Sequence, residues 1–205
     1  MGLITVGTAS DTPLLIVGFG PFGAIADNPA ARLARALDGQ LAGGRPCVGR
    51  EIPVRYREGI VETLALAAQL RPAAVIGIGV AANRPLPWVE SVGVRLGDPA
   101  ILDEAGEGVA DLEPGGPARV EATAPVGRLA AALGIGVSVD AGRYVCNAWL
   151  YRVVRAIGVG VPVIFLHIPL AGMAPERALA GLAAVWGGEG AGDVLHPGRE
   201  PGRAP

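Results

Sequence analysis

The chain contains the run Val163-Ile164-Phe165-Leu166-His167, an apolar stretch of strand length that ends in a histidine. Similar short runs rich in valine, isoleucine and leucine recur along the chain, and alanine-rich stretches with helical spacing separate them. Strands that alternate with helices are typical of a parallel sheet with helices on both faces. The sequence therefore predicts a three-layer α/β/α sandwich around a mostly parallel, twisted central sheet.

Helix start and stop signals place the other elements around this run. Asn28 precedes Pro29 at the start of an alanine-rich stretch that Gly39 ends, so a helix is predicted from Pro29 to about Leu37. The same patterns predict strands near 14–17, 51–54, 75–78, 92–96 and 137, and helices over about 57–70, 126–133, 144–157 and 175–186.

Length and composition predict one domain with a large core. The chain has 205 residues, of which 51% are hydrophobic, and a single α/β domain is predicted over residues 1–186. Residues 97–123 mix glycine, proline and acidic side chains over a length that predicts a functional loop or an irregular hairpin. Residues 187–205 are rich in glycine, proline and charge, which predicts a flexible C-terminal tail.

The charge balance argues against nucleic acid and membrane surfaces as partners. The formal net charge is −2, from 17 basic and 19 acidic residues, and no cationic stripe is visible. All the basic residues are arginines, which excludes a Schiff-base lysine, a serine–lysine dyad and a P-loop lysine. Two distant cysteines, no basic residue before Arg32 and no apolar run of membrane length predict a soluble, cytoplasmic protein.

A thiol and a base lie at the edges of two neighbouring predicted elements. Cys146 opens the predicted helix 144–157, where the positive end of the helix dipole favours the thiolate. His167 ends its strand at the carboxyl edge, where α/β proteins gather their sites, whereas His196 lies in the predicted tail. Glu90, beside another predicted strand, is the candidate third group that orients the histidine. These residues favour a cysteine hydrolase.

Each of these residues also has a purely structural interpretation. A cysteine in an apolar stretch is commonly a small buried hydrophobe, a lone histidine a half-buried ring, and a lone glutamate a solvated carboxylate. No metal or cofactor is predicted, because the two cysteines and two histidines lack the paired spacing of zinc ligands. Serine hydrolysis is disfavoured, since no serine lies in a Gly-x-Ser-x-Gly sequence.

The segment Gly18-Phe19-Gly20-Pro21-Phe22-Gly23 offers a different interpretation. It matches Gly-x-Gly-x-x-Gly directly after a predicted strand, which is the phosphate-binding pattern of dinucleotide-binding modules. In those modules the last glycine lies in a helix that has already begun, but here the helix starts only at Asn28-Pro29. A dinucleotide-binding module is therefore the weaker alternative.

Three motifs in a fixed order carry a resemblance that runs from about residue 14 to residue 186. They are Val17-Gly18-Phe19-Gly20-Pro21-Phe22-Gly23 with Asn28-Pro29 after it, Gly142-Arg143-Tyr144-Val145-Cys146-Asn147 with Tyr151 after it, and Phe165-Leu166-His167-Ile168-Pro169. These motifs resemble the signature regions of pyroglutamyl peptidase I, the pyrrolidone-carboxylate peptidase family of cysteine peptidases. The resemblance implies removal of an N-terminal pyroglutamyl residue from peptides through a thioester acyl-enzyme.

The resemblance also implies catalytic roles and partners. Cys146 would be the nucleophile, His167 the general base and acid, and Glu90 the group that orients and supports His167. The implied partners are peptides with an N-terminal pyroglutamate, no cofactor is implied, and members of the family commonly form dimers or tetramers.

The implied substrate contacts include both matches and departures. Phe19 and Phe22 match positions that sandwich the lactam ring, and Tyr144 matches an aromatic wall. Val80 stands where the family usually has glutamine, so a polar contact near the lactam is replaced, and Ser91 stands where arginine is usual. A weakened relative that only binds a lactam or peptide end, or that acts on another small amide, therefore stays open as an alternative.

Overall fold

The computed structural model describes residues 11–187 of the chain. The tail predicted over residues 187–205 lies outside the described residues from position 188 onward. Within residues 11–187, no helix combines the length and the apolar character that crossing a membrane requires.

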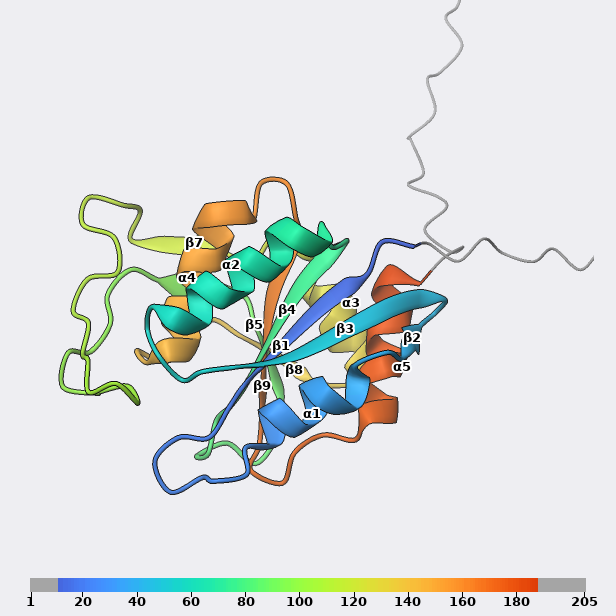
Figure 1. Ribbon diagram of the computed structural model, residues 1–205, viewed down its shortest axis with the longest axis horizontal. Helices are drawn as coiled ribbons and strands as arrows, with labels where there is room; N and C mark the ends of the chain where they lie inside the picture. Colours follow the sequence, from blue (N-terminus) through green and yellow to red (C-terminus); the bar gives the residue numbers. More distant parts are fainter. Residues whose placement is uncertain (1–10, 188–205) are drawn as a thin grey trace, which may run out of the picture.

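A seven-stranded sheet forms the centre of the molecule (Figure 1). Its strands lie in the order β2 (Leu41–Ala42), β3 (Arg45–Ile52), β1 (Leu14–Phe19), β4 (Ala74–Val80), β9 (Val163–Ile168), β5 (Trp88–Glu90) and β8 (Gly136–Ser138). The four strands β3, β1, β4 and β9 are mutually parallel, whereas β5 is antiparallel to β9 and β2 is antiparallel to β3. Strand β8 runs parallel to β5. The sheet is thus mostly parallel, as the sequence predicts.

Helices cover both faces of this sheet. One face carries α1 (Pro29–Leu37), α3 (Val126–Leu133) and α5 (Pro175–Trp186), and the other carries α2 (Glu58–Leu70) and α4 (Val145–Ile157). In Figure 1, α2 and α4 lie on the opposite side of the diagonal strands from α1 and α5. Helix α1 begins at the predicted residue, because Asn28 Oδ1 accepts a hydrogen bond from the Ala30 N–H (2.9 Å) and Pro29 occupies the first turn. The predicted α/β/α sandwich is confirmed.

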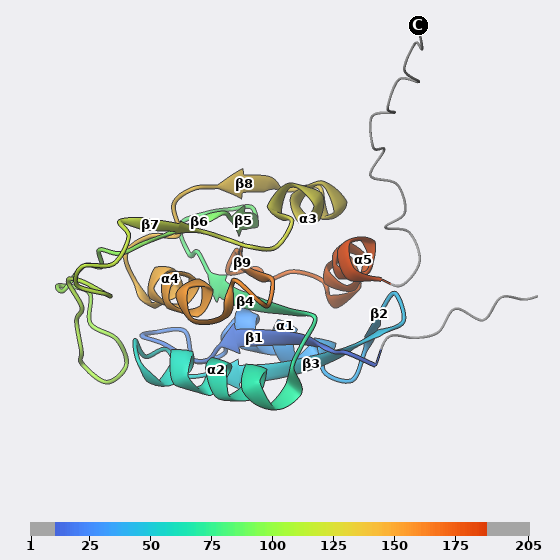
Figure 2. The same cartoon turned by 90° about the horizontal axis from the view of Figure 1, so that it is seen from above.

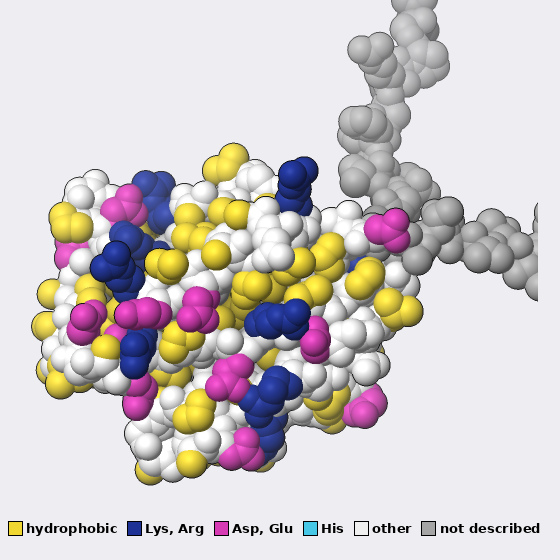
Figure 3. Space-filling view, viewed as in Figure 1, with side chains coloured by type: hydrophobic (Ala, Val, Ile, Leu, Met, Phe, Trp, Pro, Cys, Tyr) yellow, Lys and Arg dark blue, Asp and Glu magenta, His cyan; other side chains and the backbone are white. Residues whose placement is uncertain are grey.

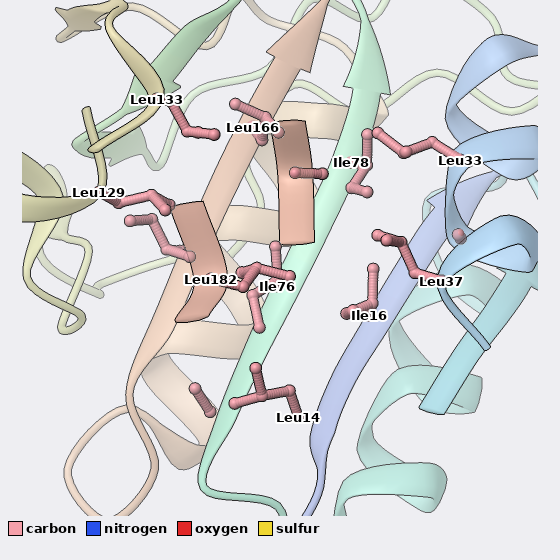
Figure 4. Packing of buried hydrophobic residues seen from close by; sticks show 14 of the residues in the cluster. Leu14, Ile16, Leu33, Leu37, Ile76, Ile78, Leu129, Leu133, Leu166 and Leu182 are labelled. Carbon is pink, nitrogen blue, oxygen red and sulfur yellow. The ribbon is translucent and has the colours of Figure 1, made fainter. Parts of the chain in front are cut away.

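The central strands are apolar on both sides because both of their faces are covered. Strands β1, β4 and β9 are buried along almost their whole length. Alternate residues of these strands pack against leucines of α1, α3 and α5 (Figure 4), with Leu14, Ile16, Ile76, Ile78 and Leu166 facing Leu33, Leu37, Leu129, Leu133 and Leu182. Because strand side chains alternate between faces, intervening residues such as Val75 and Phe165 pack on the side of α2 and α4.

One predicted strand belongs to a separate two-stranded sheet and not to the central sheet. The strand predicted at 92–96 is β6 (Val92–Val94), which pairs antiparallel with β7 (Arg119–Glu121) and packs against α4, outside the central sheet. The segment between β6 and β7 extends at one end of the molecule (Figure 2), in agreement with the irregular hairpin predicted for residues 97–123. The periodicity of a short strand does not reveal which distant segment it pairs with, so the sequence pattern could not separate the two sheets.

Three strands of the central sheet also differ from the prediction, and one of them is the two-residue strand β2, which was not predicted. Strand β5 (Trp88–Glu90) is absent from the predicted elements, because three residues are too few for a periodic pattern. Strand β3 begins at Arg45 and not near residue 51, since its partly exposed, mixed sequence lacks a clear apolar run. Strand β5 matters for function, because it places Glu90 inside the sheet.

The face seen in Figure 3 carries charges of both signs. Arginines and acidic side chains are interspersed there with apolar side chains. Ion pairs between Arg50 and Asp38 (Nη1 to Oδ1, 2.9 Å) and between Arg35 and Glu51 join β3 to the region of α1. This face therefore presents no extended field of one sign to a polyanion.

The packing of α2 against α4 can be tested at one hydrogen bond. Trp149 is fully buried, and its Nε1–H donates a hydrogen bond to Thr63 Oγ1 (2.9 Å), whose hydroxyl donates to the Gly59 carbonyl (2.7 Å). Thr63→Val keeps the shape of the side chain but leaves the indole N–H without its acceptor. We expect urea denaturation to show a free energy of unfolding lower by about 1–3 kcal/mol.

The matched control is the same substitution in a Trp149→Phe background. There the indole donor is absent, so Thr63→Val is expected to reduce the free energy of unfolding by a smaller amount. Equal losses in the two backgrounds would show that the hydrogen bond does not stabilise this contact.

Candidate active site

Three of the predicted site residues come from different elements and meet at the carboxyl end of β9. Cys146 is the second residue of α4, His167 is the penultimate residue of β9, and Glu90 ends β5. The His167 Nδ1 lies 2.8 Å from Glu90 Oε1, and the Cys146 thiol is a hydrogen-bond partner of the same ring. Since Nδ1 faces the carboxylate, Nε2 is the ring nitrogen left for the thiol.

The alternation of strand side chains aims these groups at one another. Phe165 and His167 are two residues apart in β9 and therefore share the face that α4 covers, where Phe165 packs on Trp149 with ring centroids 5.4 Å apart. Strand β5 pairs Trp88 with His167 and Glu90 with Phe165. Directly paired residues point to the same face of the sheet, so Glu90 shares the face of Phe165 and His167. The carboxylate and the imidazole therefore lie side by side.

Two glycines in β4 make room for α4 to approach the sheet. A Cβ atom at Gly77 would lie 2.6 Å from a ring atom of Trp149, and a Cβ atom at Gly79 would lie 2.7 Å from the Cys146 Sγ. Gly79 is paired with His167 in the neighbouring strand. The absence of a side chain at position 79 thus creates the space in which the sulfur lies beside the base.

The Glu90 carboxylate is completely buried, and Arg84 supplies its positive partner. The Arg84 Nη1 donates to Glu90 Oε1 (2.8 Å), and its Nη2 donates to the Asp140 carbonyl (2.9 Å). Glu90 Oε2 has no hydrogen-bond partner among the described residues. A buried carboxylate is strongly destabilising unless it is paired. Arg84 was not among the predicted site residues, although an arginine six positions before the glutamate is a readable signal.

The electrostatic environment favours a charged His167. Burial opposes protonation, but the negative charge of the Cys146 thiolate and hydrogen bonds to Cys146 and Glu90 raise the pKa of His167 to about 9. At neutral pH an imidazolium therefore lies beside the Cys146 sulfur, at the N-terminus of α4. The arrangement can therefore supply a nucleophile and a proton donor at the same time.

The four predicted substrate-binding residues line one small recess beside the sulfur. This recess has a volume of about 50 Å³, and its walls are Phe19, Phe22, Asn28, Val54, Val80, Tyr144, Val145 and Cys146. The Tyr144 ring lies 6.5 Å from that of Phe22 and 5.8 Å from that of Tyr56, measured between centroids. Burial and then the Glu104 carboxylate raise the pKa of Tyr144 to about 12, so its phenol is a neutral wall.

Asn28, which was not predicted to belong to the site, already uses its polar atoms for structure. Its Nδ2 donates to the Gly20 carbonyl (2.7 Å), and its Oδ1 caps α1. It thereby fixes the turn that carries Phe22 against the start of the helix. Apart from Cys146, the recess has no ionisable side chain other than the Tyr144 phenol, and it has no free side-chain amide.

A wider groove lies on the other side of the sulfur. Its volume is about 270 Å³, and it shares Val80, Tyr144 and Cys146 with the recess. His167 borders this groove but not the recess, and the remaining lining residues are Ala81, Ala82, Asn83, Arg84, Asp140, Ala141 and Gly142. Cys146 therefore stands between a narrow apolar recess and an open polar groove.

The glycine-rich turn after β1 does not have the geometry of a dinucleotide site. Gly18 belongs to β1, Phe22 and Ile25 form an isolated antiparallel bridge, and α1 begins only at Pro29. The start of that helix is capped by Asn28, so the glycines do not lead into a helix N-terminus as phosphate binding requires. Among residues 11–187, no group of three or more histidine, cysteine or acidic side chains has the arrangement of a metal site.

Comparison with known proteins links most of the chain to one group of enzymes. A sequence model of the family described as Pyroglutamyl peptidase matches residues 12–180. The pyrrolidone-carboxylate peptidase of Deinococcus radiodurans is 38% identical over 168 residues, which cover 76% of this chain and 77% of the relative. That of Cupriavidus pinatubonensis is 35% identical over 176 residues, which cover 80% of each chain. The solved pyrrolidone carboxyl peptidase from Thermococcus litoralis has the same fold, with a TM-score of 0.76 at 24% identity over 85% of this chain and 91% of that one.

The charge state of His167 is open to direct measurement. In NMR titrations of the ring protons, we expect His167 to titrate near pH 9, with the signal of His196 identified by His196→Gln. Cys146→Ser removes the negative charge beside the ring, and Glu90→Gln removes the carboxylate partner, so each should lower the pKa of His167. A wild-type ring that titrates at the ordinary value of about 6.5 would contradict the proposed electrostatics.

The role of Gly79 is tested by the reactivity of the thiol. Gly79→Ala forces the Cys146 sulfur away from its position beside His167, so we expect alkylation of Cys146 by iodoacetamide to slow by about tenfold or more. The rate at each cysteine is read by peptide mass mapping, which separates Cys146 from Cys47. Gly127→Ala, whose added Cβ has no atom within 4 Å, is the control and should leave the rate unchanged. Equal rates in all three proteins would disprove the packing role of Gly79.

Proposed function

The chain belongs to the pyroglutamyl peptidase family, and on that premise we propose that it is a cysteine exopeptidase that removes an N-terminal pyroglutamyl residue from peptides. Cys146 is the nucleophile, His167 the general acid and base, and Glu90 the residue that positions His167. The observation that carries the proposal is an uncharged recess that ends at Cys146, with His167 on the far side of the sulfur.

The first half of the reaction forms a thioester. The Cys146 thiolate attacks the carbonyl carbon that joins the pyroglutamyl residue to the next amino acid, and the oxyanion is met by backbone N–H groups at the start of α4. The carbon–nitrogen bond then breaks, and the departing amine takes the proton from the His167 imidazolium. The products of this step are a thioester on Cys146, a neutral imidazole and the shortened peptide.

The second half of the reaction returns the enzyme to its starting state. The neutral imidazole of His167 takes a proton from water, and the oxygen of that water attacks the thioester carbon. The carbon–sulfur bond breaks, which releases pyroglutamate and restores the thiolate and the imidazolium. Glu90 keeps the ring in one orientation and supports its positive charge through Nδ1 in both halves.

The lining of the recess supports selectivity for a lactam. A pyroglutamyl end is a neutral ring, whereas an ordinary peptide begins with an ammonium group that would have to leave water without a carboxylate partner. No acidic side chain lines the recess, and the aromatic rings of Phe19, Phe22 and Tyr144 offer a compact apolar wall. Val80 provides no polar contact, so we propose that the lactam is held by apolar packing and backbone groups.

The proposal also covers the cellular compartment and the oligomeric state. The chemistry requires a reduced thiol, which agrees with a reducing compartment such as the cytoplasm, and both described cysteines are free. We also propose that the chain assembles into a dimer or tetramer, which light scattering of the purified protein would measure.

The decisive test is hydrolysis of a fluorogenic pyroglutamyl amide in reducing buffer, with the proline and alanine amides as controls for specificity. We expect turnover of the pyroglutamyl amide alone, and a loss of about 1,000-fold or more in kcat for Cys146→Ser. Wild-type turnover that does not exceed that of Cys146→Ser would sink the proposal. Binding of pyroglutamate without turnover would instead identify a relative that keeps only the binding site.

A further inference from the structure

The position of His167 fixes the direction in which a substrate crosses the site. The departing amine receives its proton from His167, and His167 borders the polar groove but not the apolar recess. The part of the peptide that follows the cleaved bond therefore lies in the groove. This step rests on the proposed function, because it takes His167 as the proton donor.

The groove does not end at the polar residues beside His167. A second hollow of about 490 Å³ shares Arg84 and Asp140 with the groove, and its other walls are Pro85, Trp88, Val137, Ser138 and Val139. The two hollows thus adjoin at Arg84 and Asp140, between the Cys146 side of the groove and the edge strand β8. We call the second hollow, with its seven lining residues, the edge shelf.

The edge shelf is chemically different from the groove that leads to it. The side chains of Val137 and Val139 are exposed at 44% and 68%, and Trp88 is half-buried beside them. The charge of Arg84 is matched by Glu90, so its guanidinium does not present a free cation. An exposed apolar surface that continues a substrate groove marks a contact for an apolar ligand group.

The spacing of the strands determines which substrate residue reaches the edge shelf. Neighbouring strands lie about 4.8 Å apart, and an extended peptide advances about 3.4 Å per residue. The Cys146 sulfur lies beside Gly79 of β4, so a peptide that starts there and crosses toward β8 covers β9 with its first two residues. Its third residue, about 10 Å from the sulfur, then lies between β5 and β8, beside the edge shelf.

We propose that the edge shelf is a specificity site for the leaving peptide, and that it selects an apolar side chain at the third residue after the cleaved bond. The ligand is a peptide of the form pyroglutamyl-X-X-Y in which Y is a large aliphatic or aromatic residue. The shelf acts on kcat/KM through contacts made outside the recess that binds the lactam.

The test compares two amidated peptides of nearly equal size, pyroglutamyl-Ala-Ala-Leu-amide and pyroglutamyl-Ala-Ala-Asn-amide. Wild-type kcat/KM is expected to be about tenfold higher for the leucine peptide. Val139→Asp places a charge on the shelf and should reduce this ratio by at least about threefold. Val159→Asp is the matched control, because Val159 is also fully exposed but follows the end of α4 that is remote from Cys146, and it should keep the ratio.

The outcomes separate this inference from the function on which it rests. If wild type cleaves both peptides at equal kcat/KM, or if Val139→Asp leaves the ratio unchanged, the specificity site is disproved while the peptidase activity stands. A ratio that is unchanged in Val139→Asp together with a loss of self-association, measured by light scattering, would assign the shelf to contact with a second copy and overturn the proposal. Cleavage of neither peptide would overturn the proposed function and the specificity site together.

Discussion

The missing side chains of Gly77 and Gly79 control how closely α4 can approach the sheet, and the rest of the site depends on that approach. A methyl group at either position would overlap the ring of Trp149 or the sulfur of Cys146. Side-chain atoms in a close-packed interior cannot absorb such an overlap without moving the helix. The glycines therefore let Trp149 fill the space above β4, and the same docking brings the helix N-terminus, with the proposed nucleophile Cys146, to the end of β9.

A second constraint comes from the buried charge of Glu90. Because its carboxylate has no contact with water, it requires the partners that surround it, which are His167 on one side and Arg84 on the other. Arg84 also donates to the carbonyl of Asp140, in the segment that leads into α4. One guanidinium thus joins the strand that carries Glu90 to the segment that precedes Cys146. The Glu90 charge that polarises the imidazole therefore also helps to hold these segments together.

The sequence predicts local features of this molecule better than long-range ones. Helix α1 follows from the Asn28 cap and Pro29, and β9 from an unbroken apolar run, because each signal lies within a few consecutive residues. Strand β5 has only three residues and owes its place to pairing with β9 and β8, which no local pattern records. Cys146 and His167 were recognisable from their positions at element ends. Four walls of the recess, Phe19, Phe22, Val80 and Tyr144, came from family resemblance, since they belong to separate segments of the chain. Arg84 and Asn28 were not predicted as site residues, because no local pattern shows that Arg84 reaches the Asp140 carbonyl or that Asn28 borders the recess.

In the proposed reaction, the position of the sulfur between two unlike surfaces would let one site combine selectivity with turnover. The recess on one side is apolar and uncharged, so the cost of removing an ammonium from water opposes ordinary peptide ends before any bond is broken. The groove on the other side contains the protonated base, where the departing amine needs a proton. A substrate bound in the reverse direction would place its leaving nitrogen against aromatic walls that cannot donate one at neutral pH, because the pKa of Tyr144 is about 12. Direction of binding and direction of proton transfer are thus set by the same pair of surfaces.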